Sequence, residues 1–140
     1  MPASDHRDIE RFLLLMADVG RRVTDAIAGA TGELDLTSNR AVLVLCALDL
    51  EGPMRPRSLS GLTGLSSAGT TGLLDRLEAL GMISRAGGVP GDRRGVSIRL
   101  TAAGRRMVRK MTAAVDEHLP AMEILVKELG LLSDRRKQRP

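Results

Sequence analysis

The chain has 140 residues, of which 27% are charged and 43% hydrophobic, a balance typical of one globular domain with a modest core. Phe12 is the only aromatic residue, which requires an aliphatic core and disfavours stacking on single-stranded bases. One cysteine, Cys46, excludes an intrachain disulfide framework. The sequence contains no signal peptide and no apolar run of membrane-spanning length, so we expect a cytoplasmic protein.

The net charge of +4 is distributed unevenly along the chain. Residues 1–81 carry −3, residues 82–110 carry +7, and residues 111–140 are neutral overall. A basic segment of this kind is the electrostatic signature of nucleic-acid binding, although a solvated arginine-rich surface gives the same count. We favour nucleic-acid binding because the excess falls on a hairpin and the helix that follows it.

Two helices are predicted in the first third of the chain. Apolar residues recur at helical spacing from residue 8 to about residue 30, which predicts a long amphipathic helix. Such a helix at one end of a small chain more often packs against a partner than completes its own core. Residues 41–48 are apolar on nearly all sides, and Thr37 or Ser38 can cap this second helix, which we expect to be buried.

A helix-turn-helix pattern follows. A short helix fits residues 57–62, a tight turn holds Gly64, and Ser66 or Ser67 caps a helix that ends near Leu80. Two short helices joined by a glycine-containing turn form a motif whose second helix enters the major groove of DNA. The start of that helix, at Ser66, is a positive dipole end that suits a phosphate.

The second helix of this motif begins with small side chains. Ser67, Thr70 and Thr71 are expected at the base edges, where hydroxyls exchange hydrogen bonds and the threonine methyls can touch thymine methyls. No side chain here can make a bidentate base contact, so we expect few direct contacts with base edges. Gly69 and Gly72 either allow close backbone approach or weaken the helix by ~1 kcal/mol each.

A hairpin rich in arginine comes next. Residues 82–85 are predicted as one strand, residues 87–95 as a mobile tip, and residues 96–100 as a second, alternating strand. Arg76, within the preceding helix, can bind either a neighbouring side chain or a phosphate. The remaining candidate phosphate contacts around this surface are Arg55, Arg57, Arg85 and Arg99.

The last part of the chain is again helical. Thr101 caps a helix to about residue 119, and Pro120 marks a break or the first turn of a last helix that reaches residue 132. Residues 133–140 form a basic tail that we expect to be disordered. The fold class predicted is mainly α with a small β-wing.

This order of elements resembles the MarR family of winged helix-turn-helix regulators over residues 9–132. The resemblance rests on Gly64-Leu65-Ser66, on residues 73–81, on Asp92-Arg93-Arg94 and on residues 100–104, Leu-Thr-Ala-Ala-Gly. It implies a single domain of residues 1–140, with a winged helix-turn-helix at 36–104 between dimerisation helices at 8–35 and 105–132.

The resemblance also implies a homodimer in which terminal helices of both chains interleave, and it agrees with the apolar stripes on those helices. The alternative is that these stripes close one monomeric core. The residues expected at the dimer interface are Ile9, Phe12, Leu13, Met16, Leu125, Leu129 and Leu132.

The resemblance assigns roles in the hairpin tip. Arg94 is the minor-groove residue, because a guanidinium suits a groove narrowed by A·T tracts. Asp92 orients Arg94, and Arg93 reaches a phosphate or packs beside the pair. The implied function is a homodimeric repressor that binds a pseudo-palindromic operator in double-stranded DNA and is released by a small apolar effector. The alternative is a winged-helix protein-interaction module or anti-repressor that has lost DNA reading.

Other chemistry finds little support in the sequence. We see no catalytic constellation, so we do not expect an enzyme, and no cofactor or metal is expected. His6 and His118 are isolated, and a zinc contact of His118 with its acidic neighbours is disfavoured. Apolar neighbours should raise the pKa of Cys46, which favours a structural thiol over a redox sensor.

Overall fold

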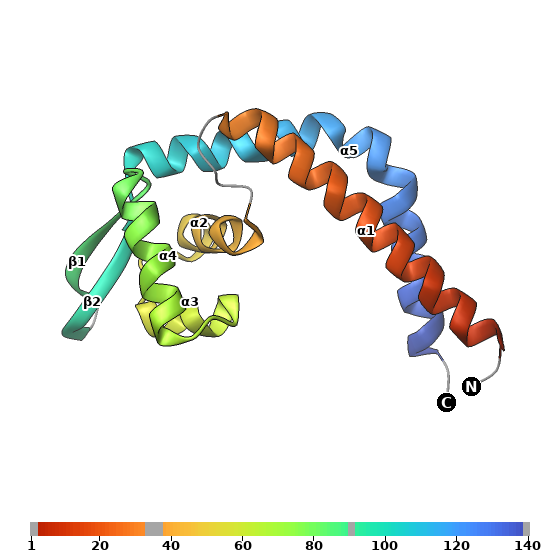
Figure 1. The fold of residues 1–140 in the computed structure, drawn as a ribbon, viewed down its shortest axis with the longest axis horizontal. Helices are drawn as coiled ribbons and strands as arrows, with labels where there is room; N and C mark the ends of the chain where they lie inside the picture. The colour runs from red at the N-terminus through yellow and green to blue at the C-terminus, as the bar shows by residue number, and fades with distance from the viewer. Residues whose placement is uncertain (1–2, 33–37, 90–91, 139–140) are drawn as a thin grey trace.

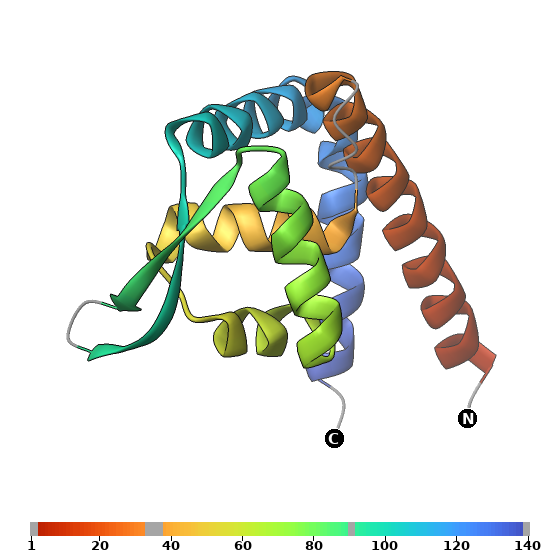
Figure 2. The ribbon, with the colours of Figure 1, turned by 60° about the vertical axis from the view of Figure 1, so that its left-hand side comes forward.

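The computed structural model describes residues 3–32, 38–89 and 92–138 (Figure 1). Two long helices lie side by side in opposite directions, and a smaller lobe of helices and a hairpin lies against the first half of the second one (Figures 1 and 2). In chain order the elements are α1 (Ala3–Thr31), α2 (Asn39–Glu51), α3 (Pro56–Thr63), α4 (Ser67–Ala79), β1 (Ile83–Val89), β2 (Asp92–Leu100) and α5 (Ala102–Lys137).

The pair formed by α1 and α5 is held by apolar packing within the chain itself. Leu15 and Ala26 of α1 are buried, as are Met122 and Leu132 in the second half of α5. An ion pair of 3.1 Å between Arg11 and Glu128 joins residues that are 117 positions apart in sequence. The amphipathic stripes of the terminal helices are therefore partly satisfied before any partner is present.

Helix α5 is continuous from Ala102 to Lys137, with Pro120 inside it. The predicted break near Pro120 is therefore wrong, and so is the predicted disordered tail for residues 133–137, which form the last turns of α5. Proline removes one backbone hydrogen bond and bends a helix, but contacts on both sides can hold the helix together. Figure 1 shows this bend, with α5 following α1 beyond it.

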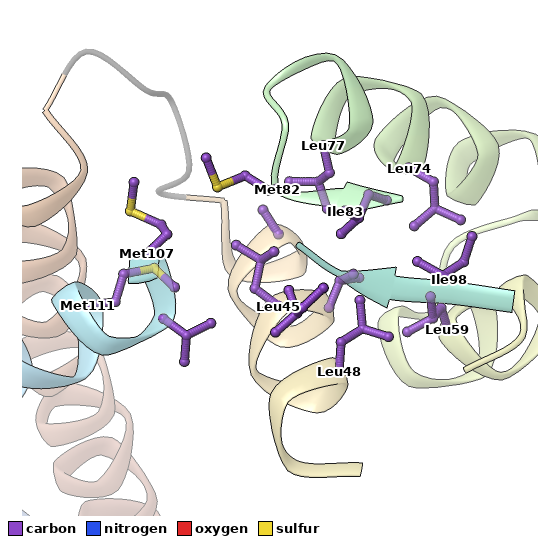
Figure 3. Packing of buried hydrophobic residues seen from close by; sticks show 14 of the residues in the cluster. Leu45, Leu48, Leu59, Leu74, Leu77, Met82, Ile83, Ile98, Met107 and Met111 are labelled. Carbon is purple, nitrogen blue, oxygen red and sulfur yellow. The ribbon is translucent and has the colours of Figure 1, made fainter. Parts of the chain in front are cut away.

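The core of the lobe is aliphatic, as the composition predicted (Figure 3). Leucines from α2 and α4 meet one isoleucine from each strand, and methionines of α5 close the side toward the long helices. Because every element of the lobe contributes to one cluster, the positions of α4 and the hairpin are fixed together. The labelled members are Leu45, Leu48, Leu59, Leu74, Leu77, Met82, Ile83, Ile98, Met107 and Met111.

The hairpin strands are longer than the sequence predicted. Antiparallel pairing runs from Ile83↔Leu100 to Val89↔Asp92, with an irregularity between Gly87 and Val89. The prediction that residues 87–95 form the tip is therefore wrong, because backbone ladder bonds do not need an alternating side-chain pattern. Met54 adds a further bridge at the base, where its N–H and carbonyl both bond Ile98, at 3.0 and 2.8 Å.

Thr101 and Gly104 join the hairpin to α5. The Thr101 hydroxyl donates to the Gly81 carbonyl at 2.6 Å and accepts from the Gly104 N–H at 2.9 Å. Thr101 thus caps α5, as predicted, and ties the start of this helix to the turn between α4 and β1. Gly104 is buried where α5 crosses the backbone of Met82.

Candidate nucleic-acid interface

Helices α3 and α4 form a helix-turn-helix whose turn and cap match the sequence prediction. Gly64 adopts a left-handed conformation with φ of 70°, which glycine tolerates without strain. Ser66 is the N-cap of α4, and its hydroxyl accepts a hydrogen bond from the Gly69 N–H at 3.0 Å. The other candidate cap, Ser67, is the first residue of the helix.

One stripe of α4 faces away from the core and carries small side chains in its first two turns. Ser67, Ala68, Thr71 and Gly72 are all exposed, and a β-carbon added at Gly72 would meet no atom within 4 Å. The Thr71 hydroxyl donates to the Ser67 carbonyl at 3.0 Å. This surface can therefore come close to a partner with its backbone, while offering few long side chains.

Thr70 does not belong to this exposed stripe, so its predicted place at the base edges is wrong. The residue is 2% exposed, and its hydroxyl lies 2.6 Å from the Ser60 hydroxyl of α3. Thr70 precedes Leu74 and Leu77 by four and seven positions, the spacing of one helix face. Its hydroxyl therefore fixes α4 against α3 inside the motif.

Arg85 of β1 is also placed differently from the other candidate phosphate contacts. Its guanidinium lies 2.6 Å from a carboxylate oxygen of Asp75 and 2.9 Å from one of Glu78, both on α4. Hydrogen bonds to Glu78 and Asp75 hold the pKa of the Arg85 guanidinium above its usual range, against the opposing effect of partial burial. Both terminal nitrogens of Arg85 therefore donate to protein carboxylates.

Four other candidate arginines remain exposed. Arg55, Arg57, Arg76 and Arg99 lie at the start of α3, within α4 and on β2. The side chains of Asp92, Arg93 and Arg94 lie outside the described residues, although their backbone belongs to β2. Their roles stay predictions.

The basic segment of residues 82–110 divides between two places. Part of its charge is on the hairpin, but Arg105, Arg106, Arg109 and Lys110 belong to the first turns of α5. Figure 1 shows that α5 starts at one end of the hairpin, whereas β1 ends and β2 begins at the other end. The excess charge therefore falls on the hairpin and on the helix that follows it, as the sequence predicted.

The start of α4 and the far end of the hairpin lie on the same side of the lobe, opposite the end at which α5 begins (Figures 1 and 2). A capped second helix with an exposed first turn, beside a two-stranded hairpin, is the arrangement that presents a helix to a groove and a wing to the flanking backbone. The lobe is therefore a winged helix-turn-helix.

A shallow cavity of about 670 Å³, widely open to solvent, lies between α1, α2 and α5. Its volume falls in the range of small-molecule sites, and its lining is mostly apolar with Arg109 and Asp116 as the charged members. Burial, with a smaller effect of Asp49, raises the pKa of the Cys46 thiol there, as the sequence indicated. The apolar lining includes Val23, Ile27, Val42, Met111, Val115 and Leu119.

The long helices also carry apolar side chains that nothing in the described chain covers. Of the predicted dimerisation residues, Phe12, Leu13 and Met16 are exposed, whereas Ile9, Leu125 and Leu129 are half-buried. Leu132 is buried by other residues of the same chain, so its side chain is not available to a dimer interface. Further exposed apolar residues on these helices were not predicted at the interface, because spacing alone does not fix which side of a helix is covered: Leu14, Leu119, Ile124, Val126 and Leu131.

Among residues 3–32, 38–89 and 92–138, no group of three His, Cys, Asp or Glu side chains could hold a metal ion. None of the helices described is both long and apolar enough to cross a membrane.

No protein-family model matches the chain. An uncharacterised HTH-type transcriptional regulator of Bacillus subtilis, YfiV, is 35% identical over 95 residues, which cover 68% of this chain and 55% of the relative. The chain thus spans about half the length of this curated relative. The structure of CouR from Rhodococcus jostii, bound to p-coumaroyl-CoA, is 31% identical with a TM-score of 0.61, covering 78% of this chain and 76% of that one.

A mutant of Escherichia coli MarR, solved with operator DNA, has the same fold with a TM-score of 0.67 and 24% identity, over 89% of this chain and 87% of that one. The winged helix-turn-helix, the flanking pair α1 and α5 and these likenesses agree. The chain belongs to the MarR family of winged helix-turn-helix regulators.

Proposed function

We propose that this protein is a homodimeric transcriptional regulator that binds double-stranded DNA in the cytoplasm and acts as a repressor. The observation that carries the proposal is the exposed first turn of α4, capped by Ser66, on the same side as the free end of the hairpin. The relatives are regulators of transcription, and one is solved on its operator, which favours binding over catalysis.

DNA would be held at two places. The start of α4 would enter the major groove, where Ser67 and Thr71 offer hydroxyls and Ala68 and Gly72 permit close approach. The wing would reach the minor groove with Arg94, positioned by Asp92, and Arg57 and Arg99 are candidate phosphate contacts. Because the major-groove face is small, we expect shape and minor-groove width to carry much of the selectivity.

A homodimer would cover the apolar surface that α1 and α5 leave exposed. Leu13 is 61% exposed, and Ile124 and Leu131 are 72% and 57% exposed. Exposed apolar side chains in such number are typical of an interface with another protein. Two-fold symmetry would then place two α4 helices on half-sites about one turn of DNA apart.

A small apolar effector would bind in the cavity between α1, α2 and α5. The cavity is lined by both long helices and by α2, the first helix of the DNA-binding lobe. A ligand that fits one arrangement of these helices better than another would shift the population toward that arrangement. The thiol of Cys46 lines this cavity. Its rate of alkylation can therefore be used to detect a bound ligand, which should slow the reaction.

The proposal is tested by selection of duplexes from a random-sequence library with the purified protein. We expect enrichment of a pseudo-palindrome with two half-sites about 10 base pairs apart. Failure to enrich any sequence over several rounds at low salt would contradict DNA reading. It would favour the second candidate, a protein-interaction module, which the short side chains of Ala68 and Gly72 would suit.

A further inference from the structure

Arg85 connects the wing to the helix proposed to read DNA. It lies on β1, whereas its two partners, Asp75 and Glu78, lie ten and seven residues earlier on α4. The partners are three residues apart on a helix, which places their carboxylates next to each other on one face. One guanidinium therefore bonds both, with one terminal nitrogen to each carboxylate.

This geometry needs the fork of an arginine. The Arg85 Nη1 and Nη2 atoms lie 2.9 and 2.6 Å from oxygens of two different side chains. The guanidinium presents fixed, divergent donors, whereas lysine has one compact ammonium on a flexible stem. A lysine would keep the positive charge here without reproducing the two-point contact.

The bridge spans the joint between α4 and β1. The turn between them is short, with Gly81 at φ of 74° and the Met82 N–H bonded to the Leu77 carbonyl at 3.0 Å. On the other strand, the Met54 bridge fixes the base of the wing at Ile98, the register partner of Arg85. Arg85 thus adds a polar tie between the wing and α4 to the apolar packing that joins them.

Asp75 also lies on the exposed side of α4, and its side chain is 64% exposed. An unpaired carboxylate there would repel phosphates. The Arg85 side chain is 29% exposed and is turned toward this carboxylate, so its charge offsets that of Asp75.

We propose that Arg85 is a positioning residue for DNA binding, which sets the wing relative to the recognition helix and neutralises Asp75, and that it is not a phosphate contact. The proposal rests on the proposed function, because the angle matters only if α4 and the wing bind one duplex. It assigns Arg85 a different role from Arg57 and Arg99, whose side chains are exposed.

Removing the two carboxylates distinguishes a positioning role from a phosphate contact, because the two roles predict opposite changes in DNA affinity. The double variant Asp75→Asn with Glu78→Gln keeps side-chain size but removes two negative charges from each chain. Simple electrostatics, or a phosphate-binding Arg85 released from competition, predicts tighter DNA binding. Positioning predicts weaker binding, by about fivefold or more, the lower end of the loss expected when an arginine leaves a groove.

The probe is the duplex that the unmodified protein enriches from the random library, with a scrambled duplex beside it. The matched control is Asp49→Asn with Glu51→Gln on α2, two exposed carboxylates with the same charge change. Its binding should stay equal or tighten slightly. The free energy of unfolding measured in urea should change little in either variant, because exposed ion pairs add little stability.

Arg85→Lys gives an independent readout. A phosphate contact would survive this substitution, whereas a two-point bridge would not, so we expect weaker binding and a smaller preference for the enriched duplex over the scrambled one. Equal or tighter binding by the carboxylate variant, or unchanged binding by Arg85→Lys, would overturn the positioning role. If the unmodified protein enriches no duplex, the proposed function fails instead.

Discussion

Replacing Gly104 with alanine should destabilise the protein, although the residue is in a helix, where alanine is normally the better choice. A β-carbon at this position would overlap the carbonyl oxygen of Met82 and lie 2.9 Å from a methyl carbon of Leu100. The backbone of Met82 is held on both sides, because its N–H donates to the Leu77 carbonyl at 3.0 Å and its carbonyl accepts from the Thr101 N–H at 3.1 Å. Neither α5 nor the turn before β1 can move without losing these bonds.

The size of the effect follows from two opposing contributions. Overpacking of a tight site costs roughly 1–3 kcal/mol. Helix propensity returns about 1 kcal/mol when glycine becomes alanine. With a backbone atom as the obstacle we take the upper figure, so the net loss in the free energy of unfolding is about 2 kcal/mol.

The assay is urea unfolding followed by circular dichroism at one fixed protein concentration, because a dimer's stability depends on concentration. Gly61→Ala in α3 is the matched control, since its β-carbon would meet nothing within 4 Å. That variant should gain up to about 1 kcal/mol. A Gly104→Ala protein as stable as its parent would refute the close approach of α5 to Met82.

Three further outcomes follow from the structure. Ser97→Ala should raise stability by about 1 kcal/mol in urea unfolding, because the buried Ser97 hydroxyl has no hydrogen-bond partner among the residues described; a loss would contradict this. Iodoacetamide should modify Cys46 more slowly in the folded than in the urea-unfolded protein, with its pH midpoint shifted upward, because burial raises the thiol pKa and lowers the thiolate fraction. Equal rates would argue against burial. Leu13→Asp should shift sedimentation toward the monomer, whereas Leu50→Asp, at an even more exposed leucine on α2, should not; a Leu13→Asp dimer would move the interface elsewhere.

Local signals in the sequence predicted the parts of the fold that local chemistry controls. The turn at Gly64, the serine cap of α4 and the end of this helix near Leu80 depend on residues within one or two turns, and all three are confirmed, with Ser66 as the cap. The all-aliphatic core follows directly from composition. The burial of Thr70 could also have been predicted, because Thr70 lies four and seven residues before Leu74 and Leu77, on the same face of the helix.

Features set by distant contacts could not be predicted in this way. Pro120 is a local signal for a break, but α5 packs along α1 and continues through it. The strands extend to Val89 and Asp92 by backbone pairing, in a segment whose glycines indicated a loop. The pairing of Arg85 across a turn with Asp75 and Glu78 depends on the angle of the hairpin, which no local pattern specifies.

The central claim is that the wing and α4 together bind duplex DNA, and fluorescence anisotropy of the enriched duplex at several salt concentrations tests it most directly. Arg94→Ala should weaken binding by about 1–3 kcal/mol, while Arg135→Ala, which removes the same charge near the far end of α5, should have little effect. Affinity should fall steeply with salt in the parent protein. Equal binding by the parent and the Arg94→Ala variant, with no preference over a scrambled duplex, would contradict the account.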